Sequence, residues 1–146
     1  MAIFYLTLDQ AIEVHKKTIE VSGGGALGHL EISKLESVLH HIQNDDYYPT
    51  IAEKLTHLFF GACKFHCFQD GNKRIAIALC VQMLLQNGYM YCTGDFLHKM
   101  ENISYHVAKG SISKELLGEI MSAFLNQEME SESLKLKILD AISEDL

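Results

Sequence analysis

A stretch of nine residues, from His66 to Arg74, contains most of the side chains in this 146-residue chain that could carry out chemistry. His66 could take a proton from an attacking hydroxyl, because the pKa of histidine lies close to neutral pH. Asp70 follows four residues later and could hold Mg²⁺, since hard cations prefer carboxylate oxygens. The stretch therefore offers a proton acceptor and a metal ligand close together.

The same stretch predicts a phosphate-binding helix N-terminus. Gly71 and Asn72 break the preceding pattern, and an apolar run from Ile75 to Leu85 follows, so a helix should begin here. The amides of its first turn would then point outward at the positive end of the helix dipole. Lys73 and Arg74, the only arginine of the chain, would add a mobile charge and a bidentate fork.

Each of these residues alone is more often structural than functional. A histidine near a helix end is usually a hydrogen-bonded polar residue, and a Lys-Arg pair at a helix start is usually a solvated surface pair. Their order within nine residues instead favours one phosphate site with a base beside it.

The stretch resembles the signature of the Fic/Doc family, H-x-F-x-[D/E]-[G/A]-N-x-R, and is closest to the death-on-curing (Doc) branch. The resemblance covers about residues 3 to 126. Besides the signature it rests on Tyr5-Leu6-Thr7, Gly23-Gly24-Gly25, Asn87-Gly88-Tyr89 and residues 107–113.

The resemblance implies a role for each residue of the signature. His66 would be the general base, Phe68 the residue that anchors the loop in the core, and Asp70 the Mg²⁺ ligand. The anion cradle for the phosphates of ATP would consist of Gly71, Asn72, Lys73 and Arg74.

Two departures bear on the group that is transferred. Adenylyl-transferring family members have glycine after the asparagine and a second arginine three residues after the first, whereas this chain has Lys73 and Ile77. Doc-like members share the lysine and lack the second arginine, and are thought to present the γ-phosphate of ATP. The resemblance thus implies a Doc-like transferase that phosphorylates a Ser or Thr hydroxyl of a target protein. A Fic-type adenylyltransferase (AMPylation) is the alternative, and a non-catalytic nucleotide- or antitoxin-binding module is a second one.

The resemblance also suggests partners. The protein would be the toxin of a toxin–antitoxin pair, with translation elongation factor as the candidate target and a small antitoxin as inhibitor. Many family members carry an inhibitory helix with S/T-x-x-x-E-[G/N]. Ser111 and Glu115 come nearest to it, but Leu116 follows them, which favours an antitoxin in trans.

Helix signals recur along the chain and period-2 patterns are almost lacking, which predicts an all-α fold. By resemblance this fold is a Fic/Doc-type bundle of six or seven short helices with a flap loop or small hairpin beside the active site. Three capping-box patterns begin helices, Thr7-x-x-Gln10, Ser33-x-x-Glu36 and Thr50-x-x-Glu53. We expect the third helix to be buried and central, and further helices over about 72–86, 93–109 and 113–124.

Two segments fall outside these helices. Residues 43–49 form a polar loop by composition, and by resemblance a flap in which Tyr47 and Tyr48 would grip the target. Residues 1–126 are expected to form the Fic/Doc domain, and residues 127–146 a tail helix with apolar positions Leu134, Ile138, Leu139 and Ile142. Packing of this tail on its own domain is the simplest expectation; insertion into the antitoxin groove or a homodimer contact are the alternatives.

Composition narrows the class of protein. A net charge of −7 without a basic stripe argues against nucleic-acid binding. No apolar run approaches the length of a membrane span and no basic leader opens the chain, so we expect no membrane partner and a cytoplasmic protein. The four cysteines, Cys63, Cys67, Cys80 and Cys92, are expected to be buried thiols, since the zinc alternative lacks a second ligand pair.

Overall fold

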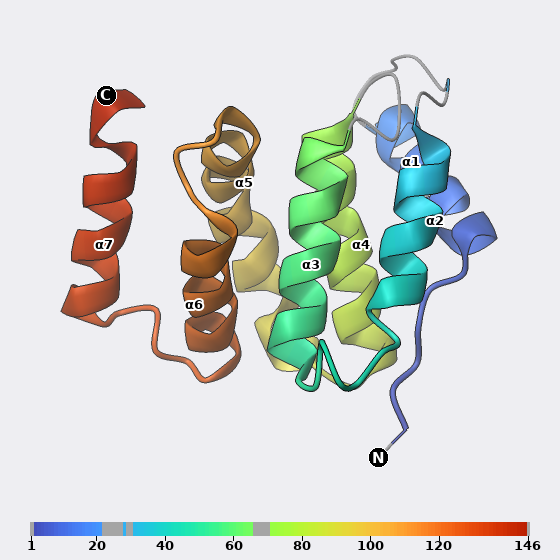
Figure 1. Ribbon diagram of the computed structural model, residues 1–146, viewed down its shortest axis with the longest axis horizontal. Helices are drawn as coiled ribbons and strands as arrows, with labels where there is room; N and C mark the ends of the chain where they lie inside the picture. Colours follow the sequence, from blue (N-terminus) through green and yellow to red (C-terminus); the bar gives the residue numbers. More distant parts are fainter. Residues whose placement is uncertain (1, 22–27, 29–30, 66–70, 146) are drawn as a thin grey trace.

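The computed structural model describes residues 2–21, 28, 31–65 and 71–145, and these residues form a helical bundle without strands (Figure 1). The prediction of an all-α fold is therefore confirmed. The α-helices are α1 (Leu8–Val21), α2 (Ile32–His41), α3 (Ile51–Lys64), α4 (Asn72–Gln86), α5 (Thr93–Lys109), α6 (Lys114–Leu125) and α7 (Glu132–Ile142). Two short 3₁₀ helices, η1 (Met90–Cys92) and η2 (Ser143–Asp145), complete the described elements.

Side-chain caps explain where most of the helices begin. The Thr7 hydroxyl accepts a hydrogen bond from the Gln10 amide at 3.1 Å, and the Gln10 side chain accepts one from the Thr7 amide at 3.0 Å. Thr50 and Ser113 cap α3 and α6 through their hydroxyl oxygens. The prediction of a cap at Ser33 is wrong, because the N-cap residue of α2 is Glu31, two residues earlier, and this helix has no side-chain cap.

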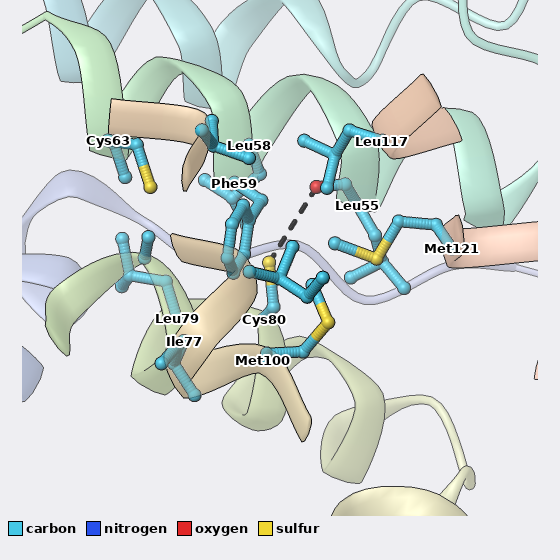
Figure 2. Close-up of a cluster of buried hydrophobic side chains, with 14 of the residues drawn as sticks. Leu55, Leu58, Phe59, Cys63, Ile77, Leu79, Cys80, Met100, Leu117 and Met121 are labelled. Atoms are coloured by element: carbon cyan, nitrogen blue, oxygen red, sulfur yellow. Dashed lines mark hydrogen bonds between the residues drawn. The ribbon is translucent and has the colours of Figure 1, made fainter. Parts of the chain in front are cut away.

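Helix α3 is the central element, as its apolar composition predicts. It packs against α2, α4, α5 and α6, and Leu55, Leu58 and Phe59 are completely buried. Figure 2 shows these side chains beside Cys80 of α4, whose thiol lies 3.7 Å from the carbonyl oxygen of Leu55. Because α3 touches so many helices, its position determines where its two ends, and the segments that follow them, are held.

The two ends of α3 lie on opposite sides of the bundle. Helices α3 and α4 lie side by side in opposite directions, so the end of α3 at Lys64 is close to the start of α4 at Asn72 (Figure 1). The connection between α2 and α3 lies at the other end of the bundle. The candidate phosphate site and the expected flap are thus at different ends.

A buried lysine holds the connection between α2 and α3. The Lys54 side chain is fully buried, and its ammonium donates hydrogen bonds to the Ile42 carbonyl and to Asp45 Oδ1, both at 2.8 Å. Burial by itself would lower the pKa of Lys54, but the bonds to Asp45 and Tyr5 outweigh it and the pKa is raised. Lys54 therefore stays charged and joins three segments of the chain.

The tail helix α7 packs against α6 at one edge of the bundle (Figure 1). Leu134 and Ile142 are buried, whereas Leu139 is 54% exposed, so Leu139 does not belong to the buried face that its spacing predicted. Beyond α7, the Asp145 carboxylate lies 2.6 Å from His106 Nδ1 and 2.9 Å from Lys109 Nζ. The tail is thus tied to the end of α5. The predicted domain boundary at residue 126 stays a prediction.

Cys63, Cys80 and Cys92 are buried free thiols, as expected, and Cys67 lies outside the described residues. Within the described part of the chain, no helix combines the length and the apolar character that crossing a bilayer requires.

Candidate functional site

The start of α4 has the geometry of an anion-binding helix end. Gly71 is the N-cap residue and has a φ of 78°. The amide of Ile75 donates the first helical hydrogen bond, to the Gly71 carbonyl at 2.8 Å. The amides of the residues between them therefore point along the helix axis, out of its positive end. This is the arrangement that binds phosphate or carboxylate groups.

Gly71 is needed at this position for two reasons. Its φ lies in the left-handed region, and a Cβ atom built on it would lie 2.8 Å from Ile19 Cδ1 of α1. The signature that the chain resembles allows either glycine or alanine at this position, and in this chain the structure favours glycine. Helix α1 approaches the start of α4 so closely that only glycine fits without strain.

The charged side chains in the first turn of α4 are all positive. Lys73 and Arg74 are exposed in the first turn, which contains no acidic residue. Cations at a helix N-terminus oppose the dipole, so a bound anion would relieve the repulsion.

The Cys63 thiol of α3 is buried and lies near Lys73 and Lys64. Burial raises the pKa of Cys63 to about 12, although nearby Lys73 and Lys64 act in the opposite direction. The thiol therefore stays protonated at neutral pH.

His15 is a neighbour of the site that the sequence analysis missed. It lies on α1, is 1% exposed, and its Nε2 atom would be 3.7 Å from a Cβ atom at Gly71. A signal was present, since His15 is the polar member of a buried stripe with Ala11 and Ile19 at a spacing of four residues. A polar residue in such a stripe is a candidate for a role at the adjoining site.

A mainly apolar groove begins beside Arg74. It has a volume of about 500 Å³ and runs between α1, α4 and α5, with Val14, Ile77 and Leu97 among its lining residues. Ile77 stands where adenylyl-transferring relatives are expected to have their second arginine. Its side chain is 8% exposed, so this position contributes apolar surface next to Arg74.

Only part of the predicted site falls on described residues. The structure brings Gly71, Asn72, Lys73 and Arg74 together at the start of α4. The predicted base His66, the anchor Phe68 and the metal ligand Asp70 lie outside the described residues.

The structure does not bring Tyr47 and Tyr48 to this end of the bundle. They precede the first residue of α3, whereas the predicted site follows its last residue, and a helix of 14 residues is roughly 20 Å long. Tyr48 stacks on His57 with ring centroids 4.6 Å apart, and Tyr47 is exposed. The length of α3 therefore separates these two tyrosines from the start of α4, and their role in gripping a target stays a prediction.

A comparison with protein families settles the wider relationship. The model of the Fic/DOC family matches residues 5–84, which is more than half of the chain. The chain belongs to the Fic/DOC family. A comparison with curated proteins gave no match.

In this Fic/DOC chain the matched part runs from the segment before α1 almost to the end of α4. It includes α1, α3 and the start of α4, the three elements that meet at the candidate site. Fic/DOC domains are generally transferases, and the matched part contains the whole of the family signature from His66 to Arg74.

Proposed function

We propose that this Fic/DOC protein is a Doc-like transferase that moves the γ-phosphate of ATP to a Ser or Thr hydroxyl of a target protein. The observation that carries the proposal is the start of α4. It combines a left-handed glycine, outward-pointing amides and two exposed cations in a first helical turn that contains no acidic residue. Phosphoryl transfer depends mainly on positioning and on stabilising charge on phosphate oxygens, and this helix end offers both.

The described residues fit the phosphates of a nucleotide. The amides of residues 71–74 would bind phosphate oxygens, Arg74 would hold two oxygens with its guanidinium, and Lys73 would add a point charge. Mg²⁺, held by Asp70, would neutralise phosphate charge when bound. His66 would accept the proton of the target hydroxyl as that oxygen attacks.

The choice of phosphate over AMP rests on Ile77. A second arginine at this position would add a cation to the groove beside Arg74, whereas Ile77 is buried and apolar. The chain thus has one arginine for the nucleotide instead of two. Adenylyl transfer remains the second candidate, because the first turn of α4 would bind the phosphates of ATP in either direction.

A toxin role with a small antitoxin is part of this proposal. The groove beside Arg74 is open between α1, α4 and α5, and the tail helix α7 lies at the edge of the bundle beyond α6. The groove would accept an apolar helix from an antitoxin, which would place an inhibitor next to the nucleotide phosphates. A target such as translation elongation factor rests on the resemblance to Doc proteins.

The test uses ATP labelled at the α or at the γ phosphate, with Mg²⁺ and cell lysate. Wild type and the His66→Ala variant are incubated, and labelled protein is detected on gels. We expect label from γ-labelled ATP alone and none with His66→Ala. Label from α-labelled ATP would replace the proposal by adenylyl transfer. Thermal stabilisation by ATP without any transferred label would indicate a non-catalytic nucleotide-binding module.

A further inference from the structure

A second pocket lies between α2 and α3, and its lining extends to Phe65, the residue before the proposed base in the sequence. Its volume is about 370 Å³, and its lining consists of Ser33, Lys34, Ser37, Val38, His41, His57 and Phe65. The polar members of this lining are hydroxyls, imidazoles and an ammonium. No carboxylate is among the described residues that line it, although the whole chain carries 19 acidic residues against 12 lysines and arginines. The pocket is therefore rich in donors within an acidic protein.

His57 supplies a buried donor at this pocket. Its side chain is 8% exposed, and its Nδ1 atom is 2.8 Å from Lys114 Nζ and 3.3 Å from the hydroxyl of Tyr48. A charged lysine can only donate, so Nδ1 accepts and the proton of the neutral ring is on Nε2. Burial, with Lys114 and His41 nearby, lowers the pKa of His57 to about 4, which agrees with a neutral ring.

The Nε2 atom has no partner within the described part of the chain. It is buried and makes no hydrogen bond there, while Lys114 lies beside Nδ1 and Tyr48 stacks on the face of the ring. His57 lines the pocket between α2 and α3, so a ligand in this pocket would be next to the ring that carries Nε2. The ring of His41, an exposed residue, is tilted by 39° to the ring of His57, and the two ring centroids are 5.8 Å apart. A ligand oxygen would reach Nε2 by displacing His41.

Lys34 provides the charge for an anionic ligand. It is exposed at the mouth of the pocket, its ammonium lies 5.9 Å from the centre of the Phe65 ring, and it takes part in no ion pair among the described residues. An aromatic face can hold a cation in position without neutralising it. A carboxylate entering the pocket would find this charge, two serine hydroxyls and the His57 donor.

The geometry points to a binding site for an acidic side chain, Asp or Glu, of the target polypeptide. This inference rests on the proposed function, which places the accepting base directly after α3. From His57 to the end of α3 the helix rises about 10 Å, a distance that about three residues of extended chain would span. The preferred substrate would then carry Asp or Glu about three residues from the modified Ser or Thr.

The binding test uses protein labelled with ¹⁵N-histidine and short peptides. The peptides are Glu-Ala-Ala-Ser and Ser-Ala-Ala-Glu, with Gln in place of Glu as controls. We expect His57 to carry its proton on Nε2, and the Glu peptides to shift its ring signals saturably while the Gln peptides do not. A proton on Nδ1, or equal binding of Glu and Gln peptides, would overturn the inference. A response of His57 to inorganic phosphate but not to the Glu peptides would show a free-oxyanion site instead.

Ser37 offers a matched pair of variants, because it is exposed on α2 and lines the pocket. Ser37→Asp places a negative charge in the pocket, and Ser37→Asn places a side chain of the same size without the charge. We expect the first to weaken binding of the Glu peptides about tenfold and the second to weaken it less than about threefold, as like-charge repulsion predicts. Equal affinities in the two variants would contradict the proposed site.

Transfer assays separate this inference from the proposed function. If wild type labels a lysate protein from γ-labelled ATP and Ser37→Asp labels it equally well, the acidic-residue site is wrong and the transferase remains. If the Glu peptides bind at His57 but no protein is ever labelled, the transferase is wrong, and the pocket is left as an acidic-peptide site only. The Lys16→Gln variant, which changes an exposed lysine of α1 outside the pocket and lowers the net charge by the same single unit, controls for overall charge.

Discussion

Arg74 is the residue whose loss should affect transfer most directly. It is exposed in the first turn of α4, next to the outward-pointing amides. Under the proposed function, Arg74→Ala should lower the rate of label transfer by about 10³-fold or more, since arginines at phosphoryl-transfer sites contribute that much. The measurement is transfer from γ-labelled ATP at saturating ATP concentration.

Arg74→Lys is the matched control for that variant. It keeps the charge and removes the bidentate fork, so we expect an intermediate rate. Equal rates for wild type, Arg74→Lys and Arg74→Ala would remove the arginine from the transfer step.

Gly71→Ala should destabilise the protein by about 1 to 3 kcal/mol, because the new side chain would be both strained at φ 78° and too close to Ile19. Gly88→Ala is the control, since Gly88 has a φ of 87° but open space around it. Urea unfolding of both variants should give a larger loss for Gly71→Ala. Equal losses would mean that α1 moves away at no cost.

At the scale of single elements, Lys54 is the residue that fixes the α2–α3 connection. Lys54→Ala should lower the free energy of unfolding by about 2 to 5 kcal/mol, because it leaves a cavity and removes the partner of the buried Ile42 carbonyl. Lys54→Met keeps most of the volume and should cost less. The measurement is urea unfolding, with Lys16→Met as a surface control expected to stay within about 0.5 kcal/mol of wild type.

Several helix bounds and caps could be predicted from the sequence. The bounds of α4 and α5 and the caps at Thr7, Thr50 and Ser113 follow from local signals, because capping and helix termination depend on neighbouring residues. The cluster of Gly71 to Arg74 at one helix end follows for the same reason. Local signals of this kind act over a single helical turn, which is why they can be read directly from the printed sequence.

The remaining features depend on which helices meet. The sequence does not say that residues 43–49 lie a full helix away from the site, that α1 brings His15 against Gly71, or that the Lys54 side chain is completely buried. Each of these results from packing between elements distant in sequence. Sequence patterns predict the buried faces of helices, with exceptions such as the exposed Leu139, but they do not predict which helices are neighbours.

At the scale of the whole molecule, Asp145 connects the tail to the bundle. Hydrogen bonds from Ser111, Lys109 and His106 lower the pKa of Asp145 to about 2, from its ordinary value of 3.8. A carboxyl whose pKa is lowered in the folded state stabilises that state above its unfolded pKa, and this contribution is lost as the pH falls to the folded pKa. The tail contact should therefore be complete above about pH 4 and lost towards about pH 2.

Asp145→Asn tests this dependence through the melting temperature. The variant should melt below wild type at neutral pH, and the difference should shrink between about pH 4 and pH 2. Asp140→Asn, on an exposed position of α7, should show no such difference. A gap between wild type and Asp145→Asn that stays constant over this range would contradict the assigned pKa.

The burial of Lys54 also has a practical consequence. Amine-reactive reagents such as acetylating agents modify an unprotonated lysine that they can reach, and this ammonium is both charged and enclosed while α2 and α3 remain docked. The rate at which Lys54 becomes labelled would therefore report how often α2 and α3 separate. Mass spectrometry of the peptide that contains Lys54 would follow this rate. Exposed lysines such as Lys16 would be labelled from the start and provide the reference rate.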